Sequence, residues 1–388
     1  MMTRTTLLML TLIAAVLLAG CGEEFPDQEA HFGLENKIRP YEITLDPPEA
    51  APGETVTATI RYHMPWASAA QATWRVALDF DSGLYETDQV ERAFVGVPDV
   101  DAAVVDAEGF VSQVARFIVP SDIYAVTSAI PEVLTDEFIL ELLHAVPDGL
   151  LSDPPRKSEV AAFLADLTAD DLVGLDDDAR AVIHRLADIF ACAVRFRVTL
   201  EDDMNVDVVR RLTVRHSGRL GSTNTNTNAE ISLFIVGEIP RHDFDLDDLE
   251  DVESEIIWHA FDEVSADGHA LARVPLDSGH TYLMRVRVAP EYYTSPFDDV
   301  RELEEETEPS WYYYRLDAPG SGHQFFVNEI GEEAEAYELD EDSRIDPPSV
   351  GSSFRVLAVV HDERGEWQRY HASPGSTTRM VEVEFVAP

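Results

Sequence analysis

The sequence predicts a mainly β protein with two tandem β-sandwich domains, the first of which carries an α-helical insertion. Three observations support this fold class. Apolar and polar residues alternate along many short segments, which is the pattern of strands with one buried face. At about 131–191 the apolar residues recur at helical spacing instead. The polar stretch Ser222–Asn228 then separates the first group of predicted strands from a second group.

The first 20 residues have the layout of a secretory signal peptide. A basic residue, Arg4, precedes the apolar stretch 7–18, and the small residues Ala19 and Gly20 end in front of Cys21. An uncleaved membrane helix is the alternative interpretation. The stretch is short for that, because a spanning helix needs about 20 apolar residues.

The run Leu18-Ala19-Gly20-Cys21 resembles the lipobox of bacterial lipoproteins, in which the cysteine is acylated and becomes the mature N-terminus. The resemblance implies acyl and diacylglycerol groups on Cys21, which together hold a protein on a membrane more firmly than one chain does. Gly22 occupies the position where an inner-membrane retention signal favours Asp, which implies the outer membrane of a Gram-negative cell. The sequence is compatible with a position on either the periplasmic or the surface face of that membrane. Residues 21–39 would form a lipid-anchored tether.

Residues 40–222 are predicted to form the first sandwich. Tyr41–Leu45, the turn-rich stretch 46–53 and the alternating Thr55–Tyr62 resemble the start of bacterial immunoglobulin-like domains. The apolar face of the third segment consists of Val56, Ala58, Ile60 and Tyr62. Further strands are expected at 74–80, 111–119, 194–200 and 206–215.

Three helices are predicted within the insertion at about 131–191. Thr135 is the expected cap of a helix over 136–145, Ser158 caps a second one, and a third covers 177–190. An insertion is preferred over three consecutive domains, because the strands before Pro120 are too few to close a sandwich. The insertion is the expected location of a partner, although it could instead only cover a sheet face or edge.

Residues 223–229 are the expected linker and 230–388 the second β-sandwich domain, which resembles immunoglobulin- or cadherin-like sandwiches. Its strands are expected at 230–236, 281–288, 310–316, 354–361 and 380–386, with a hairpin turn at 362–365 leading into 366–371. In the last strand, Val381, Val383 and Phe385 should face inward, and Glu382 and Glu384 outward. The resemblance implies no catalytic residues, because many functions use this fold.

The charge balance restricts the partners. The chain has 28 basic and 74 acidic residues, a net charge of −46. This imbalance argues against nucleic acid as a partner and against docking of the folded body on anionic lipid headgroups. It is compatible with a strongly hydrated surface, with Ca²⁺ binding and with a basic partner.

Two polar clusters invite comparison with calcium sites. Asp243–Asp251 begins like an EF-hand loop, but Asp248 occupies the glycine position and Ser254 the position of the bidentate glutamate. We therefore expect a solvated acidic segment and no metal site. Asn224, Asn226 and Asn228 resemble a cadherin junction, and we expect their amides to bond local backbone groups instead.

The remaining candidates are aromatic or sulfur-containing. Trp311–Tyr314 is expected to fill a sandwich and its edge, or alternatively to expose a platform on which sugars stack. Cys192 lies among apolar residues and has no cysteine to pair with once Cys21 is acylated, so we expect a buried, inert thiol and not a catalytic one.

No catalytic, cofactor-binding or metal-binding residues are predicted. The sequence has no His-Glu-x-x-His, no Gly-x-Ser-x-Gly and no phosphate-binding glycine loop, and Ser321 before His323 is expected to be a turn. We therefore predict a non-catalytic interaction or structural module of the cell envelope, with an envelope protein or a glycan as partner. The alternatives are a calcium-dependent adhesion or glycan-binding surface protein and an envelope hydrolase.

Overall fold

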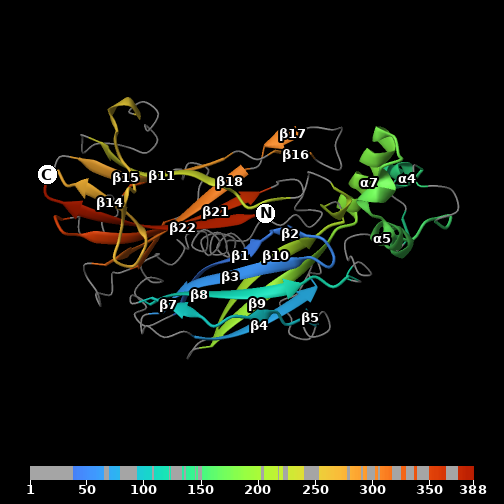
Figure 1. Cartoon of the computed structure of the whole chain (residues 1–388), viewed down its shortest axis with the longest axis horizontal. Coiled ribbons are helices and arrows are strands. Elements are labelled where there is room, and N and C mark those ends of the chain that lie inside the picture. Colours follow the sequence, from blue (N-terminus) through green and yellow to red (C-terminus); the bar gives the residue numbers. More distant parts are fainter. Residues whose placement is uncertain are drawn as a thin grey trace, which may run out of the picture.

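The structure is a computed structural model. It describes residues 38–64, 70–78, 94–106, 109–121, 123, 133–134, 137–144, 146, 151–201, 205–216, 218–221, 226–239, 253–277, 280–289, 292–294, 302–304, 306–316, 325–328, 336–338, 349–363 and 375–388. The protein is mainly β, as predicted. Its described α-helices follow one another between two β-strands and lie together at one end of the molecule (Figure 1).

Two sheets form what we call the N-terminal β region. Sheet I has the order β1-β3-β8-β6, with β7 paired to β8, and sheet II has the order β2-β10-β9-β4-β5. The strands are β1 (Arg39–Asp46), β2 (Glu49–Ala50), β3 (Thr55–His63), β4 (Gln71–Leu78), β5 (Phe94–Gly96), β6 (Asp99–Val100), β7 (Val104–Val105), β8 (Phe110–Ile118), β9 (Cys192–Glu201) and β10 (Val206–Val214).

The apolar alternation of β3 is confirmed, since Val56, Ala58, Ile60 and Tyr62 are all completely buried. They belong to one hydrophobic core to which both sheets contribute. Phe117 of sheet I meets Phe196 of sheet II edge to face, with ring centroids 5.6 Å apart. Apolar side chains on one face of each sheet therefore hold sheets I and II together.

The chain passes from sheet I to sheet II over a few residues. β1 pairs antiparallel with β3, and β2 then pairs in parallel with the end of β10. The two residues of β2 are too few for an alternating pattern, so the sequence does not predict this strand.

The helices form what we call the helical segment: α4 (Glu137–Leu143), α5 (Lys157–Asp166), α6 (Ala169–Leu172) and α7 (Asp177–Ile189). The prediction of helices between the two groups of strands is confirmed. Apolar residues from α4, α5, α6 and α7 share a hydrophobic core of their own. Leu164 and Leu186 are completely buried in it.

The described helices differ from the prediction in two respects. The sequence predicts three helices, and α6 is an additional one. Ser158 is not the cap of α5, because the helix already begins at Lys157 and its N-cap is Arg156, two residues before the predicted cap. Glu159 in the first turn accepts from the backbone N–H of Arg156, which supplies the capping contact at 3.1 Å. Asp176 caps α7 and accepts from the N–H of Ala179 at 2.8 Å. Thr135 lies outside the described residues.

Two large sheets form what we call the C-terminal β region, together with a two-stranded sheet in which β16 pairs with β17. Sheet III has the order β12-β11-β15-β20, and sheet IV the order β13-β14-β22-β21-β18-β19. The strands are β11 (Ile231–Ile239), β12 (Ile257–His259), β13 (Glu263–Val264), β14 (Ala270–Pro275), β15 (Thr281–Val288), β16 (Tyr292–Thr294), β17 (Glu302–Glu304), β18 (Glu306–Arg315), β19 (Phe325–Asn328), β20 (Ala336–Glu338), β21 (Ser353–Glu363) and β22 (Ser376–Val386). Single 3₁₀ turns occur at Gly218–Leu220 and Glu253–Glu255.

Sheets III and IV also share one hydrophobic core. Val381, Val383 and Phe385 of β22 are completely buried in it, as predicted. Phe385 packs edge to face on Tyr282 of β15, with ring centroids 5.0 Å apart. The predicted hairpin turn lies only partly inside the described residues, which exclude 364–374 and with them the expected strand 366–371.

Candidate functional site

The two β regions meet through an apolar contact between sheet I and sheet IV. Tyr41 of β1 and Phe110 of β8 form a cluster with Leu357 and Val359 of β21. All four are buried, and the rings of Tyr41 and Phe110 stack with centroids 6.1 Å apart. β21 is therefore buried on both faces, because Val356 and Ala358 on its other face belong to the core with sheet III.

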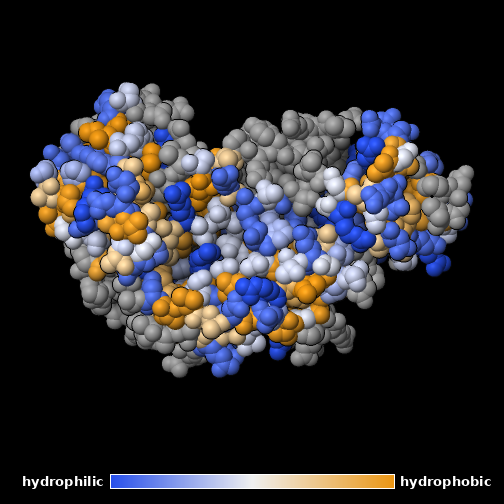
Figure 2. Space-filling model, in the orientation of Figure 1, coloured by the Kyte–Doolittle hydropathy of each residue, from blue (hydrophilic) through white to orange (hydrophobic). Residues whose placement is uncertain are grey.

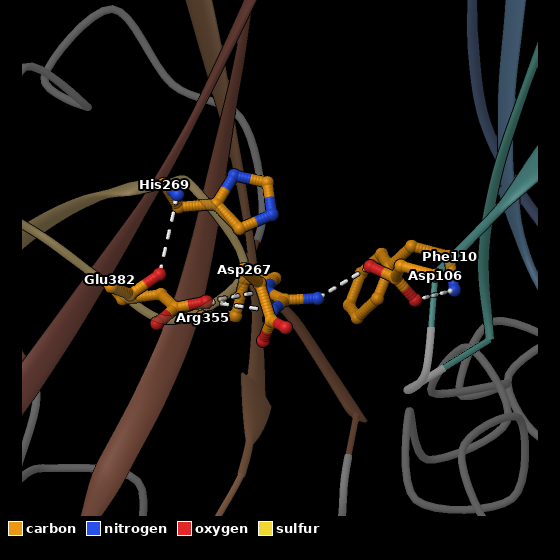
Figure 3. A network of polar contacts seen from close by, with 7 residues as sticks. Asp106, Phe110, Asp267, His269, Arg355 and Glu382 are labelled. Atoms are coloured by element: carbon orange, nitrogen blue, oxygen red, sulfur yellow. Dashed lines mark hydrogen bonds and ion pairs between the residues drawn. The ribbon is translucent and has the colours of Figure 1, made fainter.

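A completely buried arginine lies beside this apolar contact (Figure 3). Arg355 of β21 donates to Glu382 of the neighbouring strand β22, with Nε at 3.0 Å and Nη2 at 2.6 Å from Oε1. Its Nη1 donates to Asp106 of the N-terminal β region at 2.6 Å, and its Nη2 to Asp267 at 3.1 Å. The guanidinium also lies 4.9 Å from the ring centroid of Phe110. One side chain thus connects both β regions.

Glu382 faces outward from the core of its own β region, as predicted, but it is not exposed to solvent. Only 7% of its side chain is exposed. The N-terminal β region lies near that face of sheet IV, and Arg355 compensates the buried carboxylate there. Strand alternation gives the face of a residue but not what covers that face.

A second group of polar residues also connects the N-terminal and C-terminal β regions. Arg210 of β10 lies 3.3 Å from Glu42 of β1 and 3.3 Å from Nδ1 of His361 on β21. Nε2 of His361 is 3.4 Å from the other oxygen of Glu42. Burial raises the pKa of Glu42 to about 7, against the opposing charges of Arg210 and Arg61. Burial lowers the pKa of His361 to about 4, and the charge of Arg210 acts in the same direction.

These two shifts have opposite effects on stability. The raised pKa of Glu42 stabilises the fold below its ordinary value of 4.5, and this contribution is lost as the pH rises to about 7. The lowered pKa of His361 stabilises the fold above its ordinary value of 6.5, and this contribution is lost as the pH falls to about 4. In the native chain the contributions of Glu42 and His361 to the pH dependence of stability therefore largely cancel between pH 4.5 and 6.5.

Single substitutions should separate the two contributions. Relative to the native chain, we expect the free energy of unfolding of His361→Gln to fall by about 3 kcal/mol between pH 4 and 6.5. For Glu42→Gln it should rise by about 3 kcal/mol between pH 4.5 and 7. Urea denaturation at a series of pH values measures both. Parallel pH profiles for the native chain and the two variants would contradict this assignment.

A cleft of about 510 Å³ opens at the same junction. β1 and β3 line one side, and the start of β11 and of β22 the other. Asn228 connects the two sides, because its Nδ2 donates to the carbonyl of Leu45 at 2.7 Å and its Oδ1 accepts from the N–H of Ser376 at 2.9 Å. The expectation that this amide bonds only local backbone is wrong, since both partners are more than a hundred residues away in the sequence.

The helical segment is joined to sheet II by another buried arginine. Arg215, directly after β10, is completely buried, and its Nη2 lies 2.9 Å from Oε1 of the equally buried Glu49 of β2. The guanidinium also lies 3.9 Å from the carboxylate of Asp188 in α7. The other oxygen of Glu49 accepts from the N–H of Asn226 at 2.9 Å. This group connects α7, sheet II and the segment that leads to the C-terminal β region.

A histidine–carboxylate–histidine group lies in the C-terminal β region. Glu238 of β11 is 2.7 Å from Nε2 of His259 and 2.6 Å from Nδ1 of His280, each through a different carboxylate oxygen. The carboxylate thus serves as hydrogen-bond partner to both rings. Among the described residues, no group of three or more His, Cys, Asp or Glu has an arrangement that could hold a metal ion.

Several predicted candidates lie outside the described residues. These are Cys21, the acidic stretch 243–251, Asn224 and the serine–histidine turn 320–323. The backbone of Trp311–Tyr314 belongs to β18, as predicted, but the structure describes no positions for these side chains. None of the helices in the described part of the chain is long and apolar enough to cross a membrane.

Cys192 is a buried thiol, as predicted. Burial raises its pKa to about 12, so the reactive thiolate is scarce at neutral pH. We expect iodoacetamide to leave Cys192 unmodified in the folded protein and to alkylate it rapidly in 8 M urea, at a denaturant level where small domains unfold. Peptide mass spectrometry measures both rates. Alkylation of the folded protein at the rate of the unfolded chain would contradict the burial of this thiol.

Sequence reasoning missed Arg355 and Arg215, and it singled out Asn228 without predicting the contacts that this residue makes to both β regions. No protein-family model matches this sequence, and the search of curated proteins found no match.

Proposed function

We propose that this protein is a lipid-anchored cell-envelope protein that acts as a non-catalytic interaction module. In this proposal Cys21 carries the acyl groups, and two tandem immunoglobulin-like sandwiches present a helical insertion to an envelope partner. In each β region two sheets with mostly antiparallel pairing share one hydrophobic core, which supports the resemblance to that fold.

The position of the helical segment is the observation that carries this proposal. The segment lies at one end of the molecule, with the C-terminus at the other (Figure 1). It has its own core, and Arg215 with Glu49 joins it to sheet II through a fully buried ion pair. A segment held rigidly at the end of a scaffold can present a surface at little entropic cost.

The surface of this segment is suited to a polar partner. Hydrophilic side chains cover much of the face of the helical end that Figure 2 shows, with hydrophobic atoms between them. Asp170, Asp171, Asp177 and Asp178 are exposed acids in the first turns of α6 and α7. A basic surface on an envelope protein would match these charges.

The anchor can be tested by fractionation. We expect the native protein to label with an alkyne fatty acid and to sediment with membranes, because acyl chains on Cys21 bury in the bilayer. Cys21→Ala should lose both the label and the sedimentation, whereas Cys192→Ala, the matched cysteine control, should retain both. Sedimentation of Cys21→Ala with membranes at the native level would refute the proposed anchor.

A further inference from the structure

The cleft at the junction of the two β regions has the volume and the position of a ligand site. Its volume of about 510 Å³ falls within the range of about 300–1,000 Å³ that is usual for small-molecule sites. Its two sides belong to different β regions, and binding sites occur preferentially between such units. Asn228 bonds to both sides, which fixes their spacing before any ligand arrives.

A buried hydroxyl group in this cleft has no hydrogen-bond partner within the described part of the chain. Ser376 lines the cleft and is only 2% exposed. Its backbone N–H bonds to Asn228, but its Oγ makes no hydrogen bond to any atom of the described residues. Buried polar groups are normally paired, so an unpaired hydroxyl in a cleft indicates a group that a ligand can satisfy.

The charges of the lining differ from those of the whole chain. The lining contains two arginines, Arg61 and Arg379, and two acids, Asp46 and Glu230. The whole chain has 28 basic and 74 acidic residues, so the cleft is comparatively rich in basic groups. Guanidinium groups bind carboxylates through paired hydrogen bonds. The two acids make the site unfavourable for a dianion, and a single carboxylate matches it better than a phosphate.

The rest of the lining suits a molecule with many hydroxyl groups. Thr44, Thr377 and Thr378 add three hydroxyls to that of Ser376. Each hydroxyl both donates and accepts hydrogen bonds, as the hydroxyls of a sugar do. Arg61 donates to Thr44 at 3.4 Å, which links a basic group to this row of hydroxyls.

We propose that the cleft between the two β regions binds an acidic saccharide, whose carboxylate contacts Arg61 and Arg379 and whose hydroxyls contact Ser376 and the three threonines. This site is separate from the helical segment and does not depend on an anchor at Cys21. If the cleft does not bind saccharides, the proposed envelope function is therefore unaffected. If the protein has no anchor at Cys21, the proposed saccharide site is likewise unaffected.

Isothermal titration calorimetry on the full-length protein tests this site. The probes are galacturonate and sialyllactose, each of which has one carboxylate, with galacturonate methyl ester and lactose as their neutral counterparts. We expect at least one acidic saccharide to bind with one site per chain, and its neutral counterpart to bind at least about tenfold more weakly. Absence of binding heat for both acidic saccharides at millimolar concentration would overturn the proposal, as would equal binding of the neutral counterparts.

Three variants locate the binding. Arg379→Gln changes an exposed residue of the lining and should weaken binding at least about tenfold, and Ser376→Ala should weaken it to a smaller extent. The matched control is Arg273→Gln, since Arg273 is a half-exposed strand arginine that does not line the cleft. Native affinity in Arg379→Gln, or an equal loss in Arg273→Gln, would overturn the assignment. So would a short peptide carboxylate that binds as tightly as the acidic saccharides.

Discussion

Arg355→Met is expected to lower the free energy of unfolding by about 3–5 kcal/mol, because it leaves a buried carboxylate without its positive partner. Glu382 is the residue affected most, since its side chain is almost completely buried and bonds to two nitrogens of the guanidinium. The substitution also removes the hydrogen bond to Asp106 that joins the two β regions. Urea denaturation monitored by circular dichroism measures the loss.

The matched control for Arg355 is Arg273→Met. Arg273 also pairs with two carboxylates, Glu263 and Glu384, but it is half exposed. Water screens such pairs, so we expect a far smaller change in the free energy of unfolding than for Arg355→Met. The double variant Arg355→Met/Glu382→Leu should recover part of the loss, because an apolar pair can replace a buried ion pair. Equal losses for Arg355→Met and Arg273→Met would show that burial of this pair has no energetic consequence.

Arg215→Met is expected to cost a similar amount, about 3–5 kcal/mol, because it leaves the completely buried Glu49 unpaired. The loss of stability should be largest in the helical segment, since the same guanidinium also contacts Asp188 of α7. Hydrogen exchange should therefore accelerate more in α7 than in β3, whose apolar side chains belong to the core of sheets I and II.

Arg180→Met provides the control for this second substitution. Arg180 lies on α7 itself and pairs with Asp177, but its side chain is 41% exposed. We expect little change in the free energy of unfolding of this variant. Hydrogen exchange in α7 should proceed at the same rate as in the native chain. If α7 exchanges at the same rate in Arg215→Met as in Arg180→Met, the buried pair does not hold the helical segment in place.

The sequence predicts those parts of the fold that depend on local pattern. The alternation at Val56, Ala58, Ile60 and Tyr62 identifies β3 because a strand with one buried face needs that period. Helical spacing at Leu164 and Leu186 identifies the helical segment for the same reason. The first residue of a helix is harder to predict from such a pattern. α5 begins ahead of Ser158 because Glu159 accepts a capping hydrogen bond from the backbone N–H of Arg156.

The junction could not be predicted because its contacts depend on tertiary structure. Arg355 alternates with Phe354 and Val356, so it has the pattern of an exposed residue on a half-buried strand. Only the contact with the N-terminal β region buries it. Leu357 and Val359 are apolar residues on the same face as Arg355, and they are a sequence signal that this face is covered. The partners of Asn228 lie far away in sequence, and no local pattern identifies them.

The intact mass of the protein extracted from membranes of its own host tests the proposed anchor most directly. If the account is correct, the mass corresponds to residues 21–388 plus a diacylglyceryl group and a further acyl chain on Cys21. A mass that corresponds to a chain without acyl groups, whether or not residues 1–20 are still present, would contradict it.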